Sequence, residues 1–362
     1  MFDLRRRLYS TLMWQRHRLR RRQNRETHEL RYLFFEVSRR CNLSCLYCGS
    51  SCTAQQRAGE LSLDEWKRII DEVADHYDSR RIMVAITGGE PLLREDIYDI
   101  MLKLRERGFP YGMVSNATLL DDAAAKKLIA CGIRAISLSM DAPPEINDKI
   151  RGKGTSDAVI HAIQHLRDNG YTGILEIIST LSKPAIDALA EMQRFVSDLG
   201  IKRWRVAPIM PIGRATEYPE LIPDDEDLRA TLNYVKAARM SASDTLQPEF
   251  GEEGYLGDEF EGMVRPYLWH CRAGINVAGI RYNGVLAACP EISYHFDQGD
   301  LRKEAFKDIW ENRYQVFRDR SWTKKLGPCV DCEAYANCDG GAMHLYDDCD
   351  SPIKRCFYQM CK

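Results

Sequence analysis

The sequence predicts an α/β fold in which six strand–helix units form an open, partial (β/α)6 barrel, followed by a cysteine-rich C-terminal region. Short apolar, β-branched runs alternate with amphipathic helix patterns from residue 32 to about residue 210. Glycines fall where the helices should end, and 362 residues suffice for one large and one smaller domain. Such a pattern favours a parallel sheet with right-handed crossovers, whose chemistry lies at the carboxyl ends of the strands.

The chain begins with a basic segment, residues 1–31, in which ten arginines surround a stripe formed by Leu4, Leu8 and Leu12. The four-residue spacing of these leucines predicts a helical extension. The favoured interpretation is a helix packed on the domain with a solvated arginine face. A membrane-surface contact and a docking arm for an acidic partner are the alternatives.

The barrel is assigned to residues 32–215. Strands are expected at residues 32–37, 81–87, 111–116, 135–141, 173–180 and 203–209. Helices are expected at residues 63–78, 96–107, 122–131, 156–169 and 185–199, and Ser62 with Glu65 predicts a capping box at the first.

Two segments follow the barrel. Residues 216–265 are acidic and punctuated by Pro and Gly around a helix at 225–240, and are interpreted as a bridge. Residues 266–362 hold eight of the thirteen cysteines with little regular periodicity. This last region is expected to need a metal or cluster to fold.

Composition excludes several classes of protein. The formal charge is −2, so the chain as a whole is not expected to bind nucleic acid. No apolar run approaches the roughly 20 residues that span a bilayer, and the arginine-rich N-terminus is not expected to be a secretory signal. We therefore expect a cytoplasmic protein whose clustered thiols stay reduced and bind metal.

The first cysteine cluster follows the first strand with the spacing C-x3-C-x2-C. Cys41, Cys45 and Cys48 could ligate three irons of a cubane cluster and leave the fourth iron open. A structural zinc site needs four ligands, and Cys52 could supply the fourth, so zinc is an alternative. Cys52 is also the candidate for a catalytic thiol beside the reaction site.

The segment TGGEP follows the second strand. Gly88 and Gly89 would let the backbone approach a ligand closely, and Glu90 offers a carboxylate to an ammonium group. Because the first two strands should be neighbours, this turn and the cysteine loop are expected to meet at one edge of the sheet.

The segments SRRCNLSCLYC and ITGGEPLLRED together resemble the radical S-adenosylmethionine (SAM) superfamily. The resemblance implies a partial TIM-like barrel, a 4Fe-4S core cluster on the three cysteines, and SAM bound to the open iron. Reduction of the cluster would cleave SAM to a 5′-deoxyadenosyl radical that abstracts hydrogen from the substrate. An electron donor such as flavodoxin or ferredoxin would be a partner.

The same resemblance implies further contacts to SAM. The glycines and Glu90 of the TGGEP turn match the segment that binds the amino group of SAM. The remaining positions implied to contact the cofactor are Tyr47, Asn116, Ser139, Asp141 and Arg151.

The second cysteine cluster lies in the C-terminal region. By spacing alone, cysteine pairs two residues apart fit a zinc ribbon or an Fe-S corner. Their order resembles the SPASM domain, which binds auxiliary Fe-S clusters. The implied ligands are Cys271, Cys289, Cys329, Cys332, Cys338 and Cys356, with Cys361 as an alternative to Cys356.

One position departs from the SPASM pattern, because Ala342 stands where the family has a cysteine. One auxiliary cluster is therefore expected on the Cys329 group, and a second, on Cys271 and Cys289, is doubtful. Cys349 or His344 would have to complete the second.

The expected function is hydrogen abstraction from a peptide or small protein. Several phrases, among them MPIGRA and CRAGIN, resemble a SPASM subgroup associated with small lipoprotein or peptide substrates. One alternative is the same chemistry on a small molecule, such as a tetrapyrrole side chain. The other is a non-enzymatic zinc-binding module.

Overall fold

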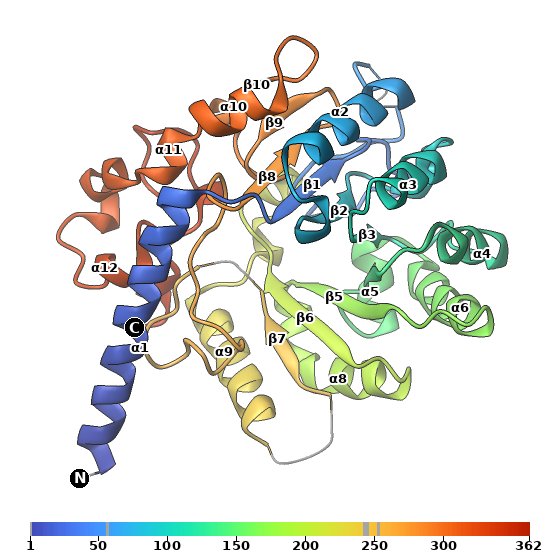
Figure 1. The fold of residues 1–362 in the computed structure, drawn as a ribbon. Helices are drawn as coiled ribbons and strands as arrows, with labels where there is room; N and C mark the ends of the chain where they lie inside the picture. Colours follow the sequence, from blue (N-terminus) through green and yellow to red (C-terminus); the bar gives the residue numbers. More distant parts are fainter. Residues whose placement is uncertain (1, 56–57, 242–245, 252–253) are drawn as a thin grey trace.

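The computed structural model describes the backbone of residues 2–55, 58–241, 246–251 and 254–362, and the side chains within these ranges from Leu12 onward. Its centre is one twisted ten-stranded sheet (Figure 1). Helices α2, α3, α4, α6 and α8 lie along the outer side of the sheet, and α1 lies beside the C-terminal elements. The leucine stripe of the N-terminal extension therefore falls mostly outside the described side chains.

The strand order is β10-β9-β8-β1-β2-β3-β4-β5-β6-β7. Strands β1 to β6 are parallel neighbours in chain order, as the sequence predicts. The strands are β1 Tyr32–Glu36, β2 Met83–Thr87, β3 Tyr111–Ser115, β4 Ala135–Ser139, β5 Ile174–Leu181, β6 Arg203–Pro208, β7 Pro248–Phe250, β8 Val277–Ile280, β9 Val285–Ala287 and β10 Gly299–Asp300.

Helices alternate with the strands, and α2 shows how the sequence starts such a helix and packs it on the sheet. Ser62 and Glu65 form both halves of the predicted capping box, and α2 then buries Trp66, Ile69 and Val73 against the sheet. The helices are α1 Phe2–Thr27, α2 Leu63–His76, α3 Ile97–Glu106, α4 Asp122–Cys131, α5 Pro144–Arg151, α6 Thr155–Asp168, α7 Lys183–Asp187, α8 Leu189–Asp198, α9 Asp225–Met240, α10 Phe306–Asn312, α11 Gln315–Arg318, α12 Tyr335–Cys338 and α13 Phe357–Met360.

Two helical features differ from the sequence prediction. Helix α5 was not expected, and it starts with Pro144, whose missing N–H has no partner to lose in the first turn of a helix. The predicted helix over 185–199 is instead two helices, α7 and α8, with Ala188 between them at φ −97° and ψ 10°. The first difference bears on the predicted site, because α5 carries Arg151.

The sheet continues beyond the six predicted strands. The segment interpreted as a bridge contributes α9 and β7, which pairs parallel with β6. At the other edge, β8 of the cysteine-rich region pairs parallel with β1, and β9 and β10 extend it antiparallel. The cysteine-rich region is thus joined to the barrel through a shared sheet and a shared hydrophobic core.

Helix α1 packs against the bridge and the C-terminal region from Trp14 onward. Trp14 is 6% exposed and meets Tyr255 edge-on, with 5.5 Å between ring centroids. Leu12, by contrast, is 63% exposed. Within the described chain, no helix combines the length and apolar character that crossing a bilayer requires.

Candidate functional site

A cavity of about 390 Å³ lies at the carboxyl ends of β1 to β4. A larger one, about 480 Å³, lies near the start of β6 and contains none of the predicted site residues. The first cavity is lined by Phe34, Cys41, Leu43, Cys45, Tyr47, Cys48, Gly49, Ser50, Cys52, Thr87, Gly88, Gly89, Val114, Ser115, Asn116, Ser139, Arg151, Cys289, Pro290 and Glu291.

The three cysteines of the first cluster all face this cavity from one loop. Backbone hydrogen bonds hold the loop: the Cys41 N–H donates to the Thr53 carbonyl at 3.1 Å, and the Leu46 N–H to the Ile150 carbonyl at 3.2 Å. Three partly exposed thiols on one cavity fit a cluster with one open iron.

Arg214 also fixes the cysteine loop, a role the sequence analysis missed. Its Nε donates to the Cys45 carbonyl and its Nη1 to the Cys52 carbonyl, both at 3.0 Å. The preceding Gly213 has φ 58°, and a Cβ there would collide with the Gly49 carbonyl. The glycine before an arginine in MPIGRA was the available signal, because only glycine allows this approach.

Cys52 is buried at the same cavity and its thiol donates a hydrogen bond to Cys48. This bond lowers the pKa of the Cys48 thiol and raises the pKa of the Cys52 thiol. The thiolate is the form of cysteine that binds metal. Cys52 is therefore placed to act on a predicted cluster ligand.

Gly88 and Gly89 bring the end of β2 against the cysteine loop. The Gly89 N–H donates to the Ser38 carbonyl at 2.9 Å, and a Cβ at Gly89 would collide with the Arg40 carbonyl. Gly88 has φ 133°, and a Cβ there would collide with the Ser38 carbonyl. Both positions therefore require glycine, as expected for a close approach of backbone.

Glu90 does not line the cavity. Its carboxylate is fully buried and accepts hydrogen bonds from the Leu92 N–H at 3.1 Å, the Ser115 hydroxyl at 3.0 Å and the Asn116 N–H at 2.8 Å. Burial raises the pKa of this carboxyl to about 7. The side chain joins the ends of β2 and β3 and so determines where Asn116 lies.

Asn116 and Ser139 reach the cavity from the ends of β3 and β4. The Asn116 Nδ2 donates to Asn42 Oδ1 at 3.0 Å and lies 3.7 Å from the sulfur of Cys41. Asn116 therefore contacts the cysteine loop directly, on the side that carries the first predicted ligand.

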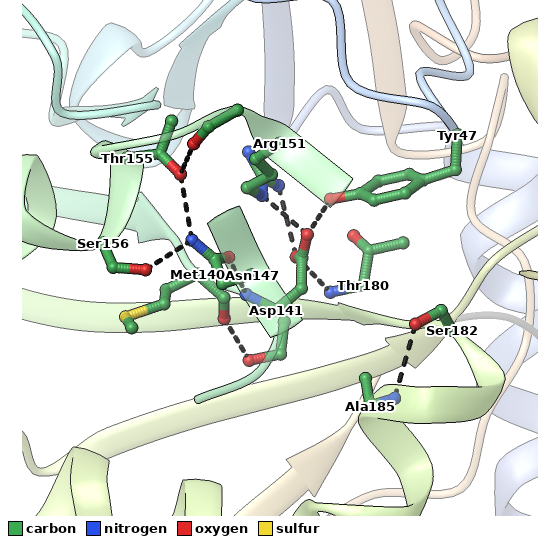
Figure 2. A network of polar contacts seen from close by, with 12 residues as sticks. Tyr47, Met140, Asp141, Asn147, Arg151, Thr155, Ser156, Thr180, Ser182 and Ala185 are labelled. Atoms are coloured by element: carbon green, nitrogen blue, oxygen red, sulfur yellow. Dashed lines mark hydrogen bonds and ion pairs between the residues drawn. The ribbon is translucent and has the colours of Figure 1, made fainter. Parts of the chain in front are cut away.

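Asp141 lies behind the cavity wall and accepts hydrogen bonds from three elements (Figure 2). The Arg151 Nε and Nη2 reach it at 2.6 and 3.2 Å, and the Thr180 N–H at 2.9 Å. The Tyr47 hydroxyl donates to it as well. Asp141 is fully buried and does not line the cavity, whereas Tyr47 and Arg151 do.

The charges of this network are consistent with a fixed ion pair. Burial raises the pKa of the Tyr47 hydroxyl far above its usual value. Burial opposes the charge of Arg151, but Asp141, Tyr47 and Cys45 together outweigh burial and raise the pKa of the guanidinium. Arg151 also stands over the Tyr47 ring at 5.7 Å, so one face of the cavity is a positioned cation on an aromatic ring.

The four cysteines of the predicted auxiliary site lie together in the C-terminal region. Burial raises the pKa of the Cys338 thiol, and the neighbouring Cys356, Cys329 and Cys332 raise it further. Four crowded thiols cannot all ionise without a compensating positive charge, which bound iron supplies. Cys361, the alternative ligand, is buried close to Cys356.

Cys271 and Cys289 lie in different surroundings. Cys289 lines the first cavity, together with Pro290 and Glu291. Burial opposes ionisation of Cys271, but Arg320 and the Met343 N–H lower the pKa of its thiol. Cys349, one of the residues that might have completed a second auxiliary site, is exposed. The geometry therefore gives less support to a second auxiliary cluster than to the first.

Two family models match the chain: the radical SAM superfamily over residues 35–192 and the SPASM iron-sulfur cluster-binding domain over residues 271–333. The Fe-coproporphyrin III synthase of Methanosarcina barkeri is 34% identical over 299 residues, 76% of this chain and 72% of that protein. The AdoMet-dependent heme synthase of the same organism is 28% identical, and the match covers 88% of this chain and 93% of that protein.

Two further matches are a maturase and a structure of an enzyme bound to a peptide. The mycofactocin maturase of Mycobacterium tuberculosis is 29% identical, covering 86% of this chain and 78% of that protein. The structure of Streptococcus suis SuiB bound to precursor peptide SuiA matches with a TM-score of 0.71 at 20% identity. The match covers 93% of this chain and 78% of SuiB, and it shows a similar fold.

A parallel barrel with three cysteines at its cavity and four more in a C-terminal region defines a class of iron-sulfur enzymes. The chain belongs to the radical SAM superfamily and carries a C-terminal SPASM domain. The alternative of a non-enzymatic zinc module is set aside, because the chain belongs to this superfamily and its relatives are enzymes by name.

Proposed function

We propose that this radical SAM enzyme cleaves SAM reductively to a 5′-deoxyadenosyl radical and abstracts hydrogen from a peptide or small protein, which it thereby modifies. The observation that carries the proposal is the convergence of Cys41, Cys45 and Cys48 on the cavity that the glycine turn and Arg151 also line. When bound, the core cluster and SAM supply the electron and the sulfonium cleavage. A small electron-transfer protein such as flavodoxin or ferredoxin would deliver the electron.

The chain's own residues would bind and orient the cofactor. Arg151 is the cation in the cavity wall and suits the carboxylate of SAM, while Asn116 and Ser139 offer polar side chains beside it. Asp141 and Glu90 lie outside the cavity, so we assign them positioning roles: Asp141 through Arg151 and Tyr47, Glu90 through Asn116.

Radical formation is tested by anaerobic reconstitution, reduction with dithionite, and chromatography of 5′-deoxyadenosine. The wild-type chain should form deoxyadenosine from SAM, and Cys45→Ala should not, because one cluster ligand is lost. Cys131→Ala is the matched control, since this buried thiol lies at the end of α4, outside the cavity. A fully iron-loaded wild-type chain that forms no deoxyadenosine contradicts the proposal.

The charge of the cavity favours a peptide over a tetrapyrrole. Of the described residues that line it, Arg151 is the only Lys or Arg, and it is already paired with Asp141. The other charged lining residue is Glu291, a carboxylate. A tetrapyrrole of the coproporphyrin type carries several carboxylates, which would need cationic partners when buried. A neutral peptide segment has no such requirement.

The peptide proposal is tested by comparing small peptides, by mass spectrometry, from cells that produce the wild-type chain and from cells that produce Cys45→Ala. A peptide whose mass changes only with the wild-type chain supports the proposal. The 34% identity to Fe-coproporphyrin III synthase makes a tetrapyrrole the second candidate. Loss of carbon dioxide from a carboxylate side chain of a tetrapyrrole, coupled to deoxyadenosine formation, would overturn the peptide class and leave the radical chemistry intact.

We also assign one auxiliary 4Fe-4S cluster to Cys329, Cys332, Cys338 and Cys356. The reconstituted chain should then hold about eight iron atoms, and Cys338→Ala about four. Cys361→Ala is the control and should keep about eight. If Cys361→Ala loses iron and Cys356→Ala does not, the fourth ligand is Cys361.

A further inference from the structure

We propose that helix α1 is a built part of the auxiliary-cluster site, and that Arg21 holds the reduction potential of that cluster above the value it would have without this guanidinium. The inference rests on the assignment of the auxiliary cluster under the proposed function. It gives the basic N-terminal segment a role in electron transfer inside the molecule, in place of an arm for a membrane or an acidic partner.

Arg21 is 8% exposed and holds the backbone beside a proposed cluster ligand. Its Nη1 donates to the Asn337 carbonyl at 2.8 Å and its Nη2 to the Ala336 carbonyl at 2.7 Å. Both carbonyls belong to α12, which ends at Cys338. The Arg21 guanidinium also lies within electrostatic range of the Cys338 sulfur.

Other arginines also lie close to Cys338 and add positive charge around it. Arg18 donates to Asn337 Oδ1 at 3.0 Å, and Arg25 forms an ion pair with Asp339, next to the cysteine. Arg320, 2% exposed, is also within electrostatic range of Arg21. Three guanidinium groups, on Arg21, Arg25 and Arg320, thus face the carboxylate of Asp339, and the surroundings of Cys338 are positive. Arginine stays protonated in proteins, so the charge is permanent.

Aromatic side chains cover one side of this site. Trp14 of α1 packs on Tyr255, which packs on Tyr358 with 5.6 Å between ring centroids. Tyr255 and Tyr358 line a small cavity of about 20 Å³ together with Cys329, Cys338 and Cys356. Helix α1 therefore supplies both a buried charge and the outer layer of an aromatic cover.

These two features act on the cluster in a known direction. A reduced cluster carries one more negative charge than the oxidised cluster, so a nearby fixed cation stabilises the reduced form and raises the potential. The burial of Arg21 strengthens the interaction, because the local dielectric is lower than that of water. Loss of the Arg21 charge should therefore lower the potential of the auxiliary cluster and leave the core cluster unchanged.

The test is a redox titration of the reconstituted full-length chain, followed by electron paramagnetic resonance and paired with an iron count. Arg21→Gln should shift the reduction equilibrium of the auxiliary cluster about tenfold toward the oxidised form, which is about 59 mV for one electron. Arg21→Lys keeps the positive charge and should shift the reduction equilibrium less than Arg21→Gln does. Arg16→Gln, on the exposed face of the same helix, is the matched control and should not shift it.

An Arg21→Gln chain with full iron and an unchanged auxiliary potential overturns the inference. Should that variant lose the auxiliary iron, Arg25→Gln carries the same test, because it removes a nearby charge and leaves the contacts to the α12 carbonyls. An unchanged potential in Arg25→Gln would then overturn the inference. A wild-type chain with only about four iron atoms overturns the cluster assignment itself, so the two failures are distinguishable.

Discussion

Asp141 joins three parts of the wall of the proposed cofactor cavity, because its buried carboxylate accepts hydrogen bonds from α5, the cysteine loop and β5. We expect Asp141→Asn to leave the Arg151 charge without its partner. Breaking a buried pair by removing one member costs about 3 kcal/mol or more. Denaturant unfolding should show this loss, and deoxyadenosine formation should fall at least about tenfold as Arg151 and Tyr47 move.

Asp122→Asn is the matched control, because Asp122 is an exposed partner of Lys126 on α4. An exposed pair of this kind contributes at most about 1 kcal/mol. If Asp141→Asn and Asp122→Asn have equal effects on stability, the central role assigned to Asp141 is wrong.

Gly89 supports a second prediction at the scale of the residue. Gly89→Ala places a Cβ against the Arg40 carbonyl, next to Cys41, so the cysteine loop must move and the chain should retain less core iron after reconstitution. Gly49→Ala is the control, because its Cβ would meet the flexible end of the Glu291 side chain at 3.0 Å. Equal iron retention by both variants would show that the close approach at Gly89 is not required.

At the scale of the residue, the sequence predicts which residues meet at the cavity better than it predicts where their side chains point. The cysteine spacing and the glycine pair predict which residues meet at the cavity, because parallel strands bring their carboxyl ends together. The direction of the Glu90 side chain depends on donors from Ser115 and Asn116 on another strand, so a carboxylate expected in the cavity is buried behind it. Cys289 likewise lines this cavity because β8 pairs with β1, a tertiary contact that no local sequence pattern predicts.

At the scale of the element, helix α1 shows how a buried imidazole makes packing depend on pH. Burial lowers the pKa of His17 to about 4 and that of His270 to about 2, and the two rings meet at 5.1 Å. The unfolded chain binds these protons near pH 6.5, whereas the folded chain does not. Stability is therefore present above about pH 6.5 and is lost as the pH falls toward 4.

We expect His17→Phe to flatten this dependence, because a phenylalanine ring keeps an aromatic partner for Trp14 and does not titrate. Between about pH 7.5 and 5.5 the wild-type chain should lose stability on the order of 1 kcal/mol more than the variant, discounted for the partial exposure of His17. Urea unfolding at both pH values measures this. The exposed His161→Gln is the control, and a His17→Phe chain with the wild-type slope would contradict the prediction.

The observed helices and strands match the predicted ones where capping residues and hydrophobic periodicity are strong, and they differ elsewhere. Helix α2 begins where Ser62 and Glu65 predict. Helix α5 has eight residues, too few for its periodicity to stand out, although Arg151 at its end belongs to the cofactor cavity. Strands β7 and β8 have three and four residues, and their partners are chosen by tertiary packing rather than by local propensity.

At the scale of the whole molecule, the shared sheet predicts that the barrel and the SPASM region resist opening together. Strand β8 pairs with β1 over four residues and is buried throughout. In hydrogen exchange of the cluster-loaded protein, peptides covering β8 should therefore be protected about as well as those covering β2, and the two-residue edge strand β10 much less. Exchange of β8 at the rate of β10 would show that the two regions open independently.

The pairing of β1 with β8 also imposes an order on biosynthesis. Strand β1 leaves the ribosome early, but the strand that covers its outer edge ends at Ile280. At 5 to 20 residues per second, the nascent barrel waits on the order of 10 to 50 seconds with that edge uncovered. During this interval Cys289, Pro290 and Glu291 have not yet joined the cavity wall, so that side of the cavity stays uncovered. Synthesis of the C-terminal region then completes that wall and removes an edge at which nascent chains could aggregate.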